Sequence, residues 1–142
     1  MLLDFNPSEL IKSKDPVLRQ AVANNGQCLD KLIDDKDQRV RAAVARQGYG
    51  LDILIHDERR EVRCAVAKQG YGLDILVHDW RKEVRWCVAM QGYGLDVLIN
   101  DAAPSVRRAV ALQGYGLDKL IDDEDANVRK AAEEMLVKQK EK

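Results

Sequence analysis

The sequence predicts an all-α fold, an α-solenoid built from 22-residue repeats of a helix, a turn and a shorter helix. The first observation is the segment Gln-Gly-Tyr-Gly-Leu-Asp at residues 47–52, which returns at Gln69, Gln91 and Gln113 with a constant spacing of 22 residues. A fixed period of this length is typical of solenoids, in which each unit buries its apolar face against its neighbours. The second observation is that apolar residues within each unit recur at i, i+3 and i+4, the spacing of one helical face.

The first half of each repeat is expected to form a helix. Val62, Ala65 and Val66 show the apolar spacing in the repeat that begins at Asp57. The pair Asp-Pro at residues 15–16 is typical of an N-cap followed by proline in the first helical turn. Gly48 and its equivalents follow the helix and suit a left-handed C-terminal cap.

The second half of each repeat, Leu-Asp-x-Leu-Ile at residues 51–55 and its equivalents, predicts a shorter helix, either α or 3₁₀. An aspartate precedes or begins each short helix, where its side chain is expected to accept backbone N–H groups as a cap. The alternative is an acidic row that binds a cation or a basic peptide. The aspartates concerned are Asp30, Asp52, Asp74, Asp96 and Asp118.

The 142 residues are expected to form a single repeat domain. Residues 1–12 form an N-terminal cap, residues 13–122 contain five full repeats, and residues 123–142 form a C-terminal capping helix with a charged tail. Terminal units of a solenoid need such polar caps because one of their faces has no neighbouring repeat.

The composition argues against several classes of protein. The 23 basic and 24 acidic residues give a formal net charge of −1, whereas dedicated nucleic-acid or anionic-membrane proteins are usually basic. No apolar stretch approaches the roughly 20 residues that cross a bilayer, and residues 1–4, Met-Leu-Leu-Asp, do not resemble a signal peptide. Three scattered cysteines favour reduced thiols and a cytoplasmic location. We expect no cofactor, no membrane partner, and a monomer or weak oligomer.

Two features of the repeat resemble known families. HEAT-like repeats resemble this chain in one feature, an aspartate followed six residues later by an arginine within a helix pair, as in Asp35 and Arg41. The compact unit is similar to the leucine-rich repeat variant family, because Val-Arg-x-Ala-Val-Ala is followed by Leu-Asp-x-Leu-Ile. The resemblance spans residues 13–135. It implies an α-helix alternating with a short 3₁₀ helix in a right-handed superhelix, and a scaffold or adaptor function. The sequence has no cysteine cluster of the kind that some relatives use for iron–sulfur binding. His56 and His78 precede aspartate, so the His-Glu pairs of HEAT-like hydroxylases are not matched.

The recurring arginine and aspartate are expected to form a structural stack of ion pairs and helix-end hydrogen bonds between neighbouring repeats. A basic row for phosphate groups is the alternative. The stack is expected to comprise Arg41, Arg63, Arg85 and Arg107 with Asp35, Asp57, Asp79 and Asp101.

Positions that vary between repeats are the better candidates for partner recognition. Trp86 lies four residues before Met90 on one helical face, and Leu112 follows in the next repeat. Trp80 occupies a position that is charged in most other repeats. Large apolar residues at such positions predict an exposed interaction patch, unless Trp86 fills a gap between helices. The basic rim of this patch comprises Arg59, Arg60, Arg81, Lys82 and Arg108.

A second candidate surface lies on the short helices, at Ile53, Ile75 and Val97. If these residues line the inner face, they suit a peptide with apolar anchors and basic flanks; if they belong to the core, this surface does not exist. His56 and His78 border it, each four residues after an aspartate, and such Asp/His pairs could bind zinc. Other repeats carry asparagine or aspartate at the histidine position, so no metal site is expected.

We therefore expect a non-catalytic protein–protein interaction module or adaptor whose partner is a protein or peptide, with no catalytic residue. The second interpretation is nucleic-acid binding through the basic rim together with Arg85, with a tryptophan stacked on a base. The third is a metal-dependent enzyme that uses the Asp/His pairs.

Overall fold

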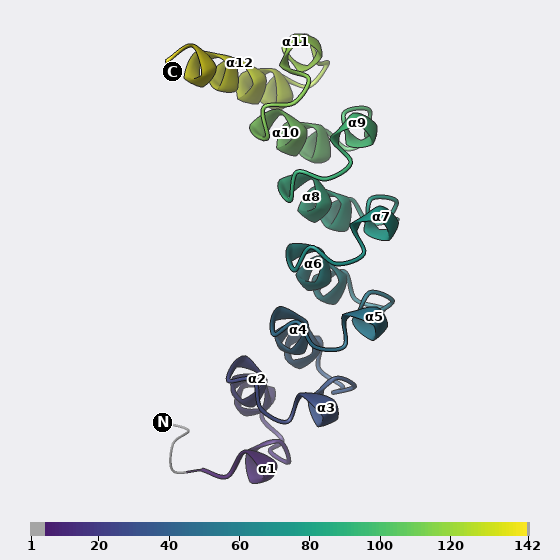
Figure 1. Cartoon of the computed structure of the whole chain (residues 1–142), viewed down its shortest axis with the longest axis vertical. Helices are drawn as coiled ribbons and strands as arrows, with labels where there is room; N and C mark the ends of the chain where they lie inside the picture. Colours follow the sequence, from purple (N-terminus) through teal and green to yellow (C-terminus); the bar gives the residue numbers. More distant parts are fainter. Residues whose placement is uncertain (1–4, 142) are drawn as a thin grey trace. The chain divides into compact units, whose positions relative to one another are not determined.

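The computed structural model describes residues 5–141, and this part of the chain contains helices but no strand. Long and short helices alternate as six pairs, with the short helix first (Figure 1). The short helices are α1 (Pro7–Leu10), α3 (Leu29–Leu32), α5 (Leu51–Leu54), α7 (Leu73–Leu76), α9 (Leu95–Leu98) and α11 (Leu117–Leu120). The long helices are α2 (Pro16–Asn24), α4 (Gln38–Arg46), α6 (Arg60–Lys68), α8 (Lys82–Met90), α10 (Pro104–Leu112) and α12 (Ala126–Lys140).

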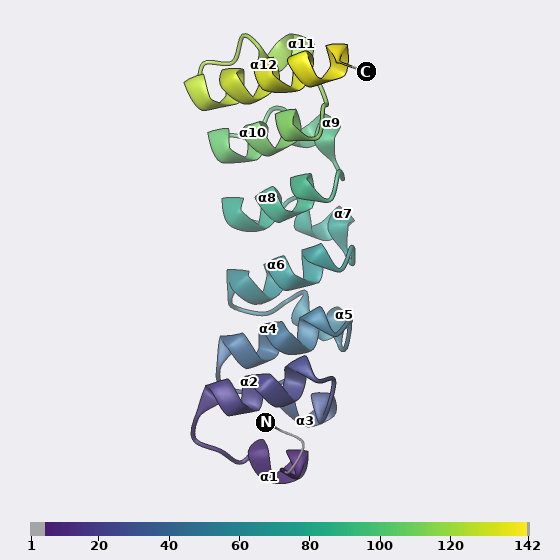
Figure 2. The ribbon, with the colours of Figure 1, turned by 90° about the vertical axis from the view of Figure 1, so that its left-hand side faces the viewer.

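The chain divides into two compact units, Met1–Gly72 and Leu73–Lys142, here called unit 1 and unit 2. In unit 1, α4 packs against α2 and α6, and in unit 2, α10 packs against α8 and α12 (Figure 2). Each short helix packs against long helices that are adjacent to it in sequence. This sequential packing of neighbouring pairs confirms the predicted all-α, solenoid-like repeat arrangement within each unit.

The long helices are held by small apolar side chains. In α4, Val40, Ala43 and Val44 are fully buried, and the equivalent residues of α6, α8, α10 and α12 are also buried. In α2 the first of these positions is Leu18, which is 37% exposed. Valine and alanine are short, so neighbouring helices can approach closely without leaving voids. The N-cap predicted at Asp15 is confirmed, because its side chain accepts a hydrogen bond from the Val17 N–H.

Two glycines in each turn connect a long helix to the following short helix. Gly48 has a φ of +76° and its N–H donates to the carbonyl of Ala45, which confirms the predicted left-handed C-terminal cap. Gly50 has a φ of +62° and is the N-cap of α5. A Cβ added there would overlap Cδ1 of Ile33, and the positive φ alone makes any other residue strained, so this position favours glycine.

The short elements are single α-helical turns rather than 3₁₀ helices. In α5 the N–H groups of Leu54 and Ile55 donate to carbonyls four residues back, and shorter three-residue bonds occur only at the two ends. The predicted capping by aspartate is wrong. Gly50, Gly94 and Gly116 are the N-caps of α5, α9 and α11, none of these helices has a side-chain cap, and the aspartate is the second helical residue.

No helix among residues 5–141 is long and apolar enough to cross a membrane. The absence of a signal peptide was predicted from residues 1–4, which lie outside the described residues, as does the last residue of the charged tail.

Candidate functional site

The recurring arginines join consecutive repeats. Arg85 in α8 donates from Nε and Nη2 to both carboxylate oxygens of Asp101, at 2.7 and 3.0 Å, and from Nη1 to the carbonyl of Asp79 at 2.8 Å. Arg107 in α10 makes the same three bonds, to Asp123 and to the carbonyl of Asp101. The predicted stack of ion pairs and helix-end hydrogen bonds is therefore present in unit 2.

Unit 1 contains the same connection. Arg41 donates to both carboxylate oxygens of Asp57 and to the carbonyl of Asp35, and Arg63 donates to the carbonyl of Asp57. Both arginines are largely buried, and the Arg41 guanidinium is directed at the Asp57 carboxylate. Hydrogen bonding to Asp57 raises the pKa of Arg41 above its ordinary value. Because a bidentate pair fixes both charged groups, this row stabilises the fold and leaves few donors for a ligand.

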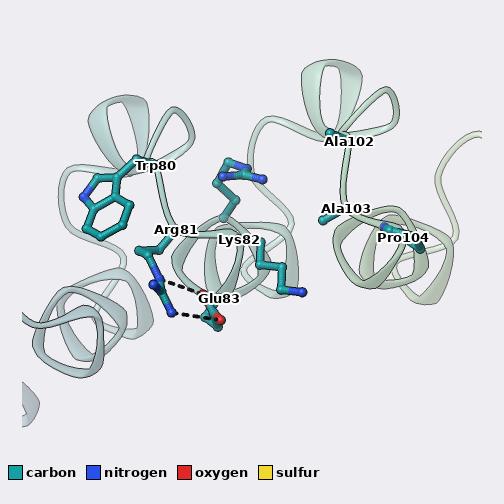
Figure 3. A pocket seen from close by; sticks show the side chains of 8 residues that line it. Trp80, Arg81, Lys82, Glu83, Ala102, Ala103 and Pro104 are labelled. Carbon is teal, nitrogen blue, oxygen red and sulfur yellow. Dashed lines mark hydrogen bonds and ion pairs between the residues drawn. The ribbon is translucent and has the colours of Figure 1, made fainter.

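An open pocket of about 600 Å³ lies in unit 2, between the starts of α8 and α10 (Figure 3). The segment that leads into each helix supplies one side of it. Three cations and one carboxylate line it, so its formal charge is positive. The lining residues are Trp80, Arg81, Lys82, Glu83, Arg85, Ala102, Ala103 and Pro104.

Trp80 dominates this pocket. Its side chain is 74% exposed, the highest exposure among the large apolar residues of the described chain. The Arg81 guanidinium lies 5.2 Å from the centre of the indole ring and also forms an ion pair with Glu83, with an Nε–Oε2 distance of 3.2 Å (Figure 3). A cation over an aromatic ring contributes about 0.5–1 kcal/mol at exposed sites. Arg81 therefore restrains an indole ring that still faces solvent.

Two cations near the pocket have no partner. Lys82 and Arg108 are exposed and form no hydrogen bond or ion pair with any residue that the structure describes. Arg108 lines a second cavity, which shares Pro104 with the first and also contains Asp125. The remaining cations of the first pocket are engaged, Arg81 with Glu83 and Arg85 with Asp101.

The structure separates the predicted patch into parts. Trp80, Arg81 and Lys82 meet in one pocket, and Arg108 lies in the adjoining cavity. The other apolar members, Trp86, Met90 and Leu112, are only half-buried and line neither cavity. Arg59 and Arg60 belong to unit 1 and are not among the residues that line the Trp80 pocket.

Sequence reasoning did not identify the residues opposite Trp80. Ala102, Ala103 and Pro104 form that side of the pocket. A signal was present, because most other repeats carry charged residues at the first two of these positions. Small side chains there keep this side of the pocket open (Figure 3).

The second candidate surface is exposed rather than part of the core. In unit 1, Ile53 is 62% exposed, and in unit 2, Ile75 and Val97 are 54% and 50% exposed. His56 and His78 are also exposed. Among residues 5–141, no group of three or more His, Cys, Asp or Glu residues is arranged to hold a metal ion.

The fold and the ionic row define a short-repeat, all-α protein with Arg–Asp ion pairs between consecutive repeats. Comparison with family models, with curated proteins and with solved structures found no match to this chain.

Proposed function

We propose that this protein is a non-catalytic interaction module that binds a partner protein through the Trp80 pocket. The observation that carries the proposal is the 74% exposed indole of Trp80, restrained by Arg81 at the rim of an open, cationic pocket. Exposed tryptophan is costly in solvent and is enriched among residues that dominate binding energy at protein interfaces.

The chemistry of the pocket indicates the kind of segment that fits it. The indole ring and the alanine and proline side chains opposite it suit an apolar or aromatic side chain. Lys82, which has no partner within the described residues, suits a carboxylate next to that anchor. The proposed partner therefore presents an acidic segment with one large apolar residue.

Nucleic-acid binding is less well supported than protein binding. Arg81 and Arg85, two of the cations on which that interpretation depends, are engaged by carboxylates of unit 2. Affinity for nucleic acid comes mainly from cations that neutralise phosphates, and only Lys82 and Arg108 are free in this part of unit 2.

The repeats are further proposed to belong to the HEAT-like or leucine-rich repeat variant type, whose known solenoids act mainly as scaffolds and adaptors. The 22-residue period and the Arg–Asp pairs support this proposal. The α-helical short elements differ from the 3₁₀ helix expected of the variant family.

The test compares the native protein with Trp80→Ala in capture from a nuclease-treated lysate, followed by titration of each purified partner. Loss of a central tryptophan costs about 2 kcal/mol or more at an interface, which is roughly a 30-fold increase in Kd. Lys82→Glu should also lower the affinity for an acidic partner, and added salt should lower the affinity of the native protein for it.

Val137→Ala provides the matched control, because Val137 is an exposed apolar residue elsewhere in unit 2, on α12. The proposal predicts unchanged partner affinity for this variant. If Trp80→Ala captures the same proteins with the same affinity as the native chain, the proposed site is wrong. Retention of nucleic acid alone, when nuclease is omitted, would favour the second interpretation.

A further inference from the structure

A second surface of unit 2 lies on its short helices. Leu76 in α7 and Leu98 in α9 are buried and hold these helices to the core, whereas the neighbouring Ile75 and Val97 are about half exposed. The equivalent residue of α11 is Lys119, which is exposed. The fold therefore accepts a charged residue at this position, and packing does not require Ile75 and Val97 to be apolar.

The two apolar residues share one side of unit 2. The short helices α7 and α9 lie on the same side of the long helices (Figures 1 and 2), and α9 packs against both α8 and α10. Since α8 and α10 pack against each other, and packed helices are about 8–10 Å apart, we infer that Ile75 and Val97 recur at about that interval.

Free carboxylates accompany this apolar row. Asp74 and Asp96 directly precede Ile75 and Val97, are exposed, and accept no hydrogen bond or ion pair from the residues that the structure describes. An aspartate in the first helical turn stabilises the helix electrostatically by about 0.3–1 kcal/mol, without engaging its oxygens. The expected role as a side-chain cap is absent, so these carboxylates remain available to cations of a partner.

The spacing selects the conformation of the ligand. In a β-strand, alternate side chains share a face, which gives intervals of about 6.6 or 13 Å. In a polyproline II helix, every third side chain shares a face and the rise is about 3.1 Å per residue, so the interval is about 9 Å. The polyproline II interval matches the spacing expected for Ile75 and Val97.

We propose that the surface formed by Ile75, Val97 and the adjacent Asp74 and Asp96 binds an extended, basic segment of a partner protein in the polyproline II conformation. An apolar residue at every third position contacts Ile75 and Val97. Lysine or arginine at an intervening position pairs with the carboxylates. Lys119 ends the apolar row at α11 and repels the basic residues, so the segment ends at α9.

The probe is a fluorescein-labelled peptide of repeated Val-Lys-Pro triplets, and the measurement is fluorescence anisotropy at low salt. The native chain should bind it saturably, and the double variant Ile75→Lys, Val97→Lys should bind at least about tenfold more weakly, since it loses both apolar contacts and adds like charge. Because Lys119 occupies the equivalent position, this variant should retain the native melting temperature.

Val137→Lys makes the same change at an exposed apolar residue on α12 and should leave the peptide affinity unchanged. A matched peptide of Val-Glu-Pro triplets should not bind. Absence of saturable binding, equal binding by all three proteins, or equal binding of the acidic peptide would overturn the proposal. Concentration-dependent sedimentation that is abolished by the double variant would instead assign this surface to self-association and overturn it as well.

Discussion

At the scale of single residues, the two glycines of each turn are needed for different reasons. Gly92 has a φ of +75°, and an added Cβ would lie 3.5 Å from Oε1 of Gln113, an ordinary contact. Gly94 has a φ of +65°, and an added Cβ would lie 2.6 Å from Cγ2 of Val77. Valine has few alternative rotamers, so this contact cannot be relieved easily.

We therefore predict that Gly94→Ala destabilises the protein more than Gly92→Ala does. In both variants an alanine must adopt the left-handed conformation, which destabilises the fold by about 1–2 kcal/mol. Only Gly94→Ala also overpacks its surroundings, which destabilises the fold by a further ~1–3 kcal/mol. The free energy of unfolding, measured by urea denaturation, reports the difference. In a Val77→Ala background the clashing methyl group is gone, and the two glycine variants should then cost the same; a difference that persists there would contradict the explanation.

At the scale of helices, the long helices differ in how they begin. Asp15 caps α2 and Asp125 caps α12 through their side chains, whereas Arg81 and Ala103 begin α8 and α10 without any side-chain cap. Among the long helices α6, α8 and α10 lack a side-chain cap, and the latter two enclose the Trp80 pocket. Capping carboxylates at those positions would add negative charge to a cationic pocket.

We predict that Ala103→Asp stabilises the protein by about 1 kcal/mol, the usual contribution of an N-cap relative to alanine. The backbone of Ala103, with φ −88° and ψ 122°, already has the N-cap conformation. The same substitution should lower the affinity of the Trp80 pocket for an acidic partner. Thermal unfolding and partner titration measure the two effects, and Asp15→Ala, which removes an existing cap, should lower stability by a similar amount. A decrease in stability for Ala103→Asp would contradict the prediction.

The sequence pattern predicted the long helices better than the starts of the short ones. Apolar spacing and the glycine after each long helix were sufficient to predict the long helices, because both signals depend on local backbone geometry. Leu-Asp-x-Leu resembles a capped helix start, yet the chain enters α9 from Gly94 in the left-handed region, which makes Leu95 the first helical residue and Asp96 the second. That one-residue difference follows from the left-handed conformation of Gly94, a position where any side chain would overlap Val77.

At the scale of the whole molecule, exposure was the least predictable property. Trp80 and Trp86 both replace charged or small residues of other repeats, but Trp80 faces solvent while Trp86 is half-buried. The difference arises from their places in the repeat, since Trp80 precedes α8 and Trp86 lies within it. Periodicity identifies equivalent positions, and only the packing of neighbouring repeats decides which of them a partner can reach.

The Arg–Asp pairs occur in both units, and they make the stability of the fold depend on pH. Hydrogen bonding from Arg107 holds the pKa of Asp123 below its ordinary value, and the backbone N–H of Asp125 adds to this effect. A lowered pKa in the folded state means that the ionised carboxylate stabilises the fold. This contribution is complete above the unfolded pKa of about 3.9 and is lost as the pH falls through the folded pKa.

We predict that Asp123→Asn lowers the free energy of unfolding at pH 7 by about 1.5–3 kcal/mol, the contribution of hydrogen bonds to a charged group. The side chains of Arg107 and Asp123 are each only 9% exposed, so solvent screens the pair weakly. Urea unfolding at a series of pH values should show the difference between native and variant shrinking as the pH falls below about 4, because the native carboxylate then also becomes neutral. Asp118→Asn removes an exposed carboxylate that has no partner among the described residues, and it should change stability little at any pH. A difference between native and Asp123→Asn that stayed constant down to strongly acidic pH would show that the ion pair is not its cause.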